Sequence, residues 1–122
     1  MRLSDQSKLH DVYAAEYDKQ VRAYDCHITD VLFGLTYEFI SSGQVLLDIG
    51  IGSGLSSQFF ARAGLQVHGM DFSSEFLKLC GEKGFCTSLT QHDITQVPWP
   101  YPAVQFDHVI CCGVMHFIPD LE

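Results

Sequence analysis

The chain has 122 residues, of which 47% are hydrophobic and 18% are charged, and its formal net charge at pH 7 is −8. This length and composition predict a single folded domain over residues 1–122, and the acidic balance, without a run of Lys or Arg, argues against a nucleic-acid partner. No stretch reaches the roughly 18 apolar residues of a membrane span, and the charged N-terminus has no signal-peptide core, so we expect no membrane association and a cytoplasmic location.

The first predicted elements are two amphipathic helices. Apolar residues recur at helical spacing over Ser7–Lys19 and again over Ile28–Ile40. Ser41, Ser42 and Gly43 then break the second pattern, which places the end of that helix before residue 43.

After these helices, short apolar runs alternate with helical patterns. The predicted strands are Val45–Ile49, Gln66–Met70, Phe85–Gln91 and Phe106–Cys112. A helix follows each of the first two strands, the second one capped by Ser73 or Ser74, and no further helix or strand is expected before Glu122. Because strands joined by helices pair in parallel through right-handed crossovers, we predict an α/β fold with a doubly wound, mainly parallel sheet, preceded by N-terminal helices.

The most informative segment is the glycine-rich turn DIGIGSG at residues 48–54, which lies between the first strand and the next helix. Glycines allow a tight turn and the close approach of a ligand. The spacing G-x-G-x-G differs from the G-x-G-x-x-G fingerprint that seats a dinucleotide pyrophosphate. Asp48 would repel a pyrophosphate but suits a ligand that carries an ammonium group and a sulfonium, as S-adenosylmethionine does.

The stretch VLLDIGIGSG, from Val45 to Gly54, resembles the first motif of class I S-adenosylmethionine-dependent methyltransferases. Three further stretches are similar to family motifs in the same order: HGMDFS, QHDIT, and FDHVI followed by VMHFIPD. The resemblance runs from about Tyr13 to Leu121. It implies a Rossmann-like methyltransferase fold, S-adenosylmethionine as cofactor, and in-line transfer of its methyl group to a small-molecule acceptor.

The resemblance also implies roles for individual residues beyond the turn. Asp71 would accept hydrogen bonds from both ribose hydroxyls, and Phe72 would pack on the adenine. Asp93 would face the adenine amino group, beside the backbone nitrogen and apolar side chain of Ile94. The backbone at Cys111 would hold the amino group of the cofactor.

The remaining site residues follow from the same resemblance. Tyr17 would belong to an N-terminal helix that covers the cofactor, and His116 would be either a general base or a packing residue near the methyl acceptor. The predicted contacts within the turn are Asp48, Gly50, Gly52, Ser53 and Gly54.

Several of these residues also have purely structural interpretations. The glycines could serve only strand-to-helix packing, Asp71 could cap the following helix, and Asp93 could stabilise a turn. Five cysteines without C-x-x-C spacing and histidines without helical metal-ligand spacing predict reduced thiols and no metal site.

The pattern departs from the family in its length. The family fold has seven strands in the order 3-2-1-4-5-7-6, whereas the strand pattern here is truncated after the fourth. We expect the apolar edge of the fourth strand to be covered by a missing C-terminal half or by a second copy in a homodimer. Three functions stay open: an active small-molecule methyltransferase, a truncated cofactor-binding remnant that acts as a non-catalytic interaction subunit, and an NAD-type oxidoreductase, which the glycine spacing disfavours.

Overall fold

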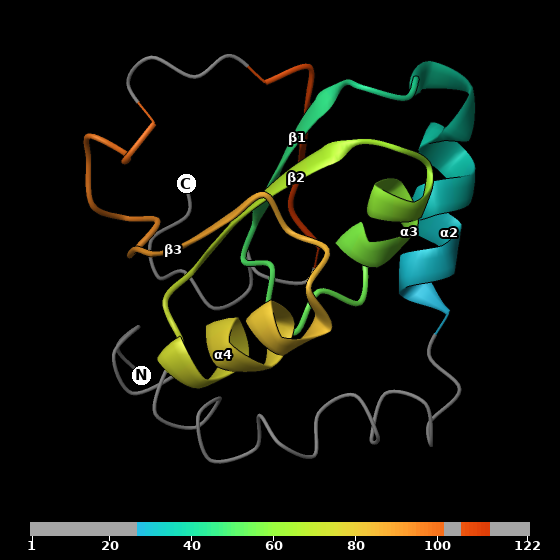
Figure 1. Ribbon diagram of the computed structural model, residues 1–122. Helices are drawn as coiled ribbons and strands as arrows, with labels where there is room; N and C mark the ends of the chain where they lie inside the picture. The colour runs from blue at the N-terminus through green and yellow to red at the C-terminus, as the bar shows by residue number, and fades with distance from the viewer. Residues whose placement is uncertain (1–26, 102–105, 113–122) are drawn as a thin grey trace.

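Four parallel strands form the centre of the computed structural model, which describes residues 27–101 and 106–112. The strands are β1 (Val45–Ile49), β2 (Gln66–Asp71), β3 (Ser88–Gln91) and β4 (His108–Ile110), in the order β3-β2-β1-β4 (Figure 1). The chain therefore moves outward from β1 to β3 and then crosses back to the other side of β1. This reversal is the switch point of a doubly wound sheet, so the predicted α/β fold is confirmed.

Within the described residues, three α-helices and one short 3₁₀ turn accompany the sheet. They are α2 (Ile28–Thr36), η1 (Tyr37–Phe39), α3 (Ser57–Arg62) and α4 (Ser74–Lys83). The prediction of a continuous helix to Ile40 was wrong at its end, because the helix gives way to η1 after Thr36. The Thr36 hydroxyl donates to the carbonyls of Leu32 and Phe33 at 3.1 Å, which competes with the regular helical hydrogen bonds.

The helix α4 begins and ends at the residues that the sequence indicates. Ser73 is its N-cap, with the Phe76 amide donating to the Ser73 hydroxyl at 3.2 Å, and Gly84 ends it in the left-handed conformation at φ 74°. The strand after it begins at Ser88 rather than at the predicted Phe85. Phe85 packs against the core on the face of the sheet that the helices cover, and strand pairing starts only after it. It therefore belongs to the connection between α4 and β3.

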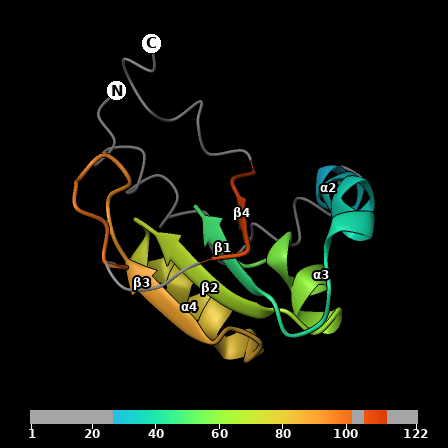
Figure 2. The ribbon, with the colours of Figure 1, turned by 90° about the horizontal axis from the view of Figure 1, so that it is seen from above.

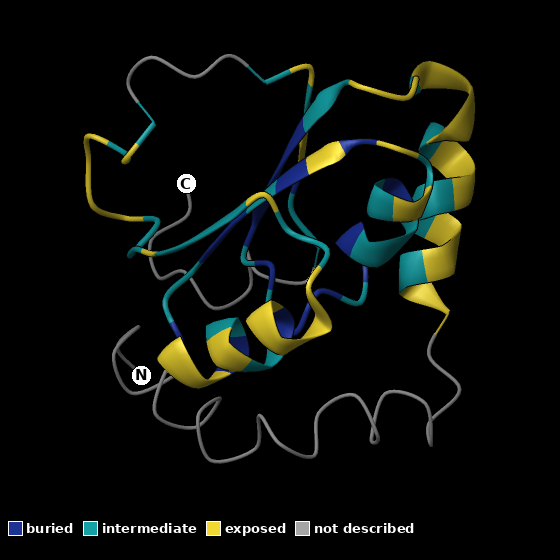
Figure 3. Cartoon of the chain, viewed as in Figure 1, coloured by how far each residue is buried: buried dark blue, intermediate teal, exposed yellow. Residues whose placement is uncertain are grey.

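The two faces of the sheet have different covers. Leu46 and Val67 point to the face where the three helices pack, whereas Leu47 and Met70 point to the opposite face. That second face is covered in part by the segment that leads to β4, with Trp99 packed against it. Figure 2 shows α2 and α3 on the side of the sheet away from this segment, and Figure 3 shows burial concentrated on β1 and β2.

Two of the predictions from the sequence fall outside the described residues. The helix expected over Ser7–Lys19, with Tyr17, lies in the segment 1–26, and His116 lies in the segment 113–122. Within the described ranges, no helix is long and apolar enough to span a membrane.

Candidate cofactor site

The predicted site residues gather at one edge of the sheet. The glycine turn follows β1, Asp71 is the last residue of β2, Asp93 follows β3, and Cys111 follows β4. Because all four strands run in parallel, their carboxyl ends lie at the same edge, which is where open α/β sheets bind ligands. The fold thus brings together residues that are up to 63 positions apart in sequence, from Asp48 to Cys111.

The glycine turn has a backbone that only glycine adopts readily. Gly50, Gly52 and Gly54 have φ values of 72°, 58° and 90°. The amides of Gly50 and Ile51 both donate to the Met70 carbonyl, at 2.7 and 3.1 Å, which fixes the turn to the end of β2. A Cβ atom on Gly52 would meet nothing within 4 Å, so the middle of the turn borders open space.

The last glycine of the turn is packed much more tightly. A Cβ atom on Gly54 would lie 2.6 Å from Phe85 Cζ and 2.9 Å from Cys80 Sγ. The structure gives two reasons for a glycine at this position. Both the positive φ and the contact with the α4 side of the core require a residue without a side chain.

Asp71 links the turn to the next helix. Its Oδ2 accepts a hydrogen bond from the Gly52 amide at 2.8 Å, and its Oδ1 accepts one from the Ser73 amide at 2.9 Å. Asp71 is not the cap of α4, because Ser73 is the N-cap, but it holds the backbone at that cap residue. Its contact with a ribose stays a prediction, and it would have to be made by oxygens that already hold the backbone.

Asp48 is a buried carboxyl group with an unsatisfied oxygen. Its side chain is 2% exposed, and Oδ2 has no hydrogen-bond partner among the described residues. Burial raises the pKa of Asp48 from 3.8 to about 7, and the nearby Asp71 carboxylate adds to the increase. Near neutral pH this group is therefore poised between its neutral and ionised forms, and a cation placed beside it would favour the ionised form.

Ser57 is a neighbour of Asp48 that the sequence reasoning missed. It is the first residue of α3, is fully buried, and its hydroxyl acts against the rise in the pKa of Asp48. However, neither Ser57 Oγ nor Asp48 Oδ2 makes a hydrogen bond of normal geometry within the described part of the chain. The two unsatisfied groups belong to β1 and α3, the elements on either side of the glycine turn. Unsatisfied buried polar atoms of this kind are rare in folded proteins. The only sequence signal was a serine at the start of a helix that follows the turn.

The residues after β3 are held mainly by local contacts. Asp93 Oδ1 accepts hydrogen bonds from the Thr95 amide at 2.9 Å and the Thr95 hydroxyl at 2.6 Å, which is the turn-stabilising role. The Ile94 carbonyl accepts from Trp99 Nε1 at 3.0 Å. Phe72 is half-buried, and its carbonyl accepts from the Gln91 side chain at 3.1 Å. Contacts of these residues with an adenine stay predictions.

Cys111 completes the edge after β4. Its side chain is half-buried, and burial, together with the nearby Asp48, raises the pKa of its thiol. The thiol therefore stays protonated at neutral pH, which leaves the backbone as the part of this residue suited to hold a ligand. No group of three His, Cys, Asp or Glu side chains that could hold a metal ion occurs in the described ranges.

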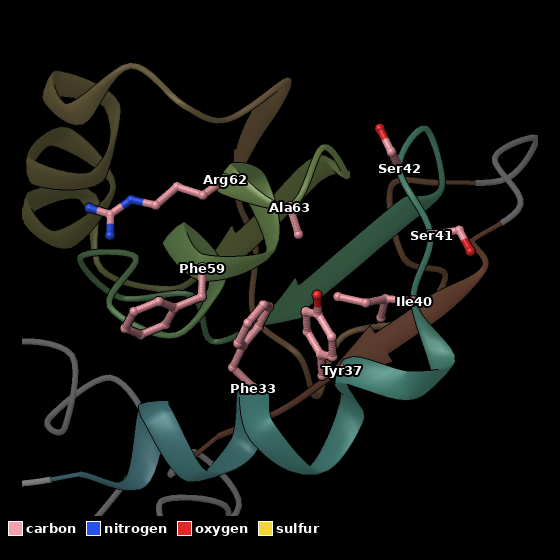
Figure 4. Close-up of a pocket in the computed structure, with 8 residues that line it drawn as sticks. All are labelled: Phe33, Tyr37, Ile40, Ser41, Ser42, Phe59, Arg62 and Ala63. Carbon is pink, nitrogen blue, oxygen red and sulfur yellow. The ribbon is translucent and has the colours of Figure 1, made fainter.

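A separate hollow lies at the other edge of the sheet. A cavity of about 550 Å³ opens beside the segments that lead into β1 and β2, and Figure 4 shows it in close-up. Its lining residues are Phe33, Tyr37, Ile40, Ser41, Ser42, Phe59, Arg62 and Ala63. In Figure 4 the guanidinium of Arg62 points away from Tyr37 and Ile40. None of the predicted cofactor residues in the described ranges lines this cavity, so the polar site and this hollow are distinct.

Comparison with known proteins matches residues 47–122, more than half of the chain, to the model of a methyltransferase domain. The chain belongs to the methyltransferase domain family. The matched region contains the glycine turn, Asp71 and β4. The match gives no support to the alternative of an NAD-type oxidoreductase.

Individual relatives are similar over most of the chain but are longer. An "uncharacterized methyltransferase" of Geobacillus thermodenitrificans is 31% identical over 121 residues, which are 93% of this chain and 54% of that protein. A ubiquinone biosynthesis O-methyltransferase of Bordetella parapertussis is 35% identical over 83 residues, 65% of this chain and 34% of that protein. The chain spans about half the length of the methyltransferases that it matches over nearly its full length.

Solved structures of the family have the same fold. The magnesium protoporphyrin IX methyltransferase of Synechocystis PCC 6803, solved with bound SAM, is 25% identical with a TM-score of 0.66, over 83% of this chain and 50% of that one. A TehB-like SAM-dependent methyltransferase of Corynebacterium glutamicum has a TM-score of 0.71 at 19% identity, over 93% of this chain and 60% of that one.

Proposed function

We propose that the chain binds S-adenosylmethionine at the carboxyl edge of its sheet and contributes this site to the methylation of a small-molecule acceptor. The observation that carries the proposal is the buried carboxyl group of Asp48, which has one oxygen without a hydrogen-bond partner among the described residues and lies at the start of a turn of three left-handed glycines. A buried carboxylate without a partner is unfavourable unless a cation or a hydrogen-bond donor approaches it. The cofactor carries both an ammonium group and a sulfonium, so the residues present fit it.

The residues of the chain would position the cofactor. When bound, S-adenosylmethionine supplies an activated methyl group, so the protein needs to align the donor and acceptor rather than form a covalent intermediate. Gly52 would let the cofactor approach the backbone, because its missing side chain leaves open space. Asp48 would attract the cationic end, and Asp71 would hold the turn in place while its oxygens meet the ribose.

The acceptor is proposed to be a small molecule. Two relatives support this class by name, since one is a ubiquinone biosynthesis enzyme and the other a magnesium protoporphyrin IX methyltransferase. The formal charge of −8 is unfavourable for an acceptor that carries many phosphates. The role of His116 as a base near the acceptor and the cytoplasmic location stay predictions.

We also propose that the working protein covers the free edge of β4 with additional strands of the methyltransferase fold. In the described part of the sheet β4 pairs only with β1, and Val109 at its centre is 56% exposed. An apolar edge of this kind is a template for further pairing. The longer relatives make strands of the same fold the preferred cover, with a second copy of the chain as the competing result.

The decisive experiment compares binding by the wild-type chain and an Asp48→Asn variant. Calorimetric titration with S-adenosylmethionine should show binding by the wild type that strengthens as the pH rises from 6 toward 8, because a cation binds the ionised form of Asp48. Binding should release protons near pH 6.5, measured as a dependence of the heat on the ionisation enthalpy of the buffer. The variant should bind at least about tenfold more weakly without this proton release.

The matched control is Asp107→Asn. Asp107 is an exposed carboxylate at the opposite edge, where its Oδ2 accepts from the Val45 amide at 2.8 Å. Its replacement should leave the affinity and the proton release unchanged. A folded wild-type chain that does not bind the cofactor would refute a binding site in this chain. Tight binding without activity toward any acceptor would instead favour a non-catalytic interaction subunit.

A further inference from the structure

A pair of thiols lies next to the glycine turn, and neither thiol belongs to the predicted cofactor site. Cys80 is in α4 and is fully buried, and Cys86 lies three residues beyond the end of this helix and is half-buried. Their Sγ atoms are 3.7 Å apart, and both thiols are free. The distance is short enough for an S–H···S hydrogen bond and longer than the roughly 2.05 Å of a disulfide.

The two thiols differ in reactivity. The hydrogen bond between Cys80 and Cys86 lowers the pKa of Cys86, and the positive charge of Lys83 acts in the same direction. The same hydrogen bond, together with burial, raises the pKa of Cys80. The thiolate therefore forms at Cys86, which is also the thiol that solvent can reach.

The pair is in contact with the ligand-binding turn. Cys80 Sγ would be 2.9 Å from a Cβ atom on Gly54, so the sulfur packs directly against the last glycine of the turn. Phe85, the residue before Cys86, packs against the same glycine, with its Cζ 2.6 Å from that Cβ position. A movement of Cys80, or of the backbone that joins Phe85 to Cys86, that draws the two sulfurs together shifts a group that packs against Gly54.

The connection between the two cysteines can accommodate such a movement. It contains Gly81 and the left-handed Gly84, both exposed, and a Cβ atom on Gly84 would meet nothing within 4 Å. Glycines give this short segment more conformational freedom than other residues would.

We propose that Cys80 and Cys86 are a redox-sensitive thiol pair, which hydrogen peroxide converts to a disulfide that loosens the glycine turn. The Cys86 thiolate attacks one peroxide oxygen, the O–O bond breaks, and a sulfenic acid and hydroxide form, the latter taking up a proton to give water. The Cys80 sulfur then attacks the sulfenic sulfur, the S–O bond breaks, and the departing hydroxyl leaves as a second water with the Cys80 proton. Two thiols lose two electrons in total, and one hydrogen peroxide is reduced to two waters.

The effect on the turn is independent of any ligand, whereas an effect on affinity rests on the proposed cofactor function. Oxidation should weaken cofactor binding by at least about tenfold, because only molecules with a formed turn are competent to bind. Reduction with dithiothreitol should restore both the turn and the affinity.

The test treats the full 122-residue chain with hydrogen peroxide and maps the cysteines by alkylation and mass spectrometry. Cys80 and Cys86 should lose reactivity together, as one disulfide, and amide hydrogen exchange over residues 50–58 should become faster. Cys86→Ser should abolish both changes, and this half-buried position avoids the risk that a fully buried Cys80→Ser variant fails to fold. Cys112→Ser is the matched control and should retain both changes.

Each outcome bears on a separate part of the proposal. Thiols that stay free, or Cys86 that is oxidised to sulfinic acid without pairing, would overturn the thiol pair. A disulfide that forms without faster exchange in the turn would overturn the coupling. A reduced chain that does not bind S-adenosylmethionine would contradict the proposed function alone, because the alkylation and exchange results do not depend on the cofactor.

Discussion

Each end of the central strand pair β1 and β4 carries an aspartate. The two aspartates differ in their burial and in their hydrogen bonding. Asp107, at the amino edge before β4, is exposed, and its carboxylate accepts a hydrogen bond from the Val45 amide. Asp48, near the carboxyl end of β1, is 2% exposed with an oxygen that has no partner among the described residues. The Asp107 carboxylate has its hydrogen-bond partner within the fold, whereas Asp48 keeps a buried oxygen that a bound cation or hydrogen-bond donor would satisfy. Such unsatisfied groups are where function is expected.

The largest expected effect is the pH dependence of stability that Asp48 causes. The pKa of Asp48 rises from 3.8 to about 7 on folding, so the folded chain binds more protons than the unfolded chain between these values. The free energy of unfolding should therefore fall as the pH rises from about 4 to about 7, and above that range the full penalty from Asp48 should persist without further change with pH.

Removing the charge at this position should remove the penalty. Asp48→Asn should stabilise the ligand-free chain at pH 8 by about 2 to 4 kcal/mol relative to wild type, measured by urea unfolding, with no gain at pH 4. Asp107→Asn should show no gain at either pH. A variant at Asp48 that loses stability at pH 8 would mean that the carboxylate has a stabilising partner.

A pair of glycine substitutions isolates the crowding at the carboxyl edge. Gly43 and Gly54 both have φ 90°, but a Cβ atom would meet nothing within 4 Å at Gly43 and would clash with Phe85 and Cys80 at Gly54. Gly43→Ala should cost about 1 kcal/mol for the backbone conformation alone. Gly54→Ala should cost about 3 kcal/mol because overpacking adds to it. Equal losses in urea unfolding would show that the turn relaxes freely.

The smallest effect on stability is expected at the free edge of β4. Val109→Lys places a charge on an exposed side chain and should change the free energy of unfolding by less than about 0.5 kcal/mol. If a second copy covers this edge, sedimentation will show a wild-type dimer that the variant converts to a monomer. A monomeric wild type would exclude the homodimer and favour further strands as the cover.

The sequence alone predicted the features that depend on the spacing of nearby residues. The existence of the four strands, the glycine turn and the Ser73 cap depends on spacing within about ten residues, and the parallel order follows from the alternation of strands and helices. The predicted bounds of the last strand were wrong, because β4 covers only His108–Ile110 of the predicted Phe106–Cys112. Family resemblance added Asp71, and the structure places it at the end of β2 beside the turn.

The rest depends on three-dimensional contacts between side chains, which the spacing of residue types does not encode. Phe85 was assigned to a strand because it is apolar, but its contact with Gly54 removes it from the sheet. The proximity of Ser57 to Asp48 depends on how α3 leaves the turn. The closeness of Cys80 and Cys86 depends on how the chain leaves α4.

The measurement that tests the central claim most directly is a titration of the ¹⁵N-labelled chain with S-adenosylmethionine, followed by amide chemical shifts. The account predicts large shifts at Gly50, Gly52 and Gly54 and at the residues after Asp71, with no shift at Gly43. Shifts confined to the residues around the Phe33 and Tyr37 cavity, or the absence of any shift in a folded chain, would contradict a cofactor site at the carboxyl edge of the sheet.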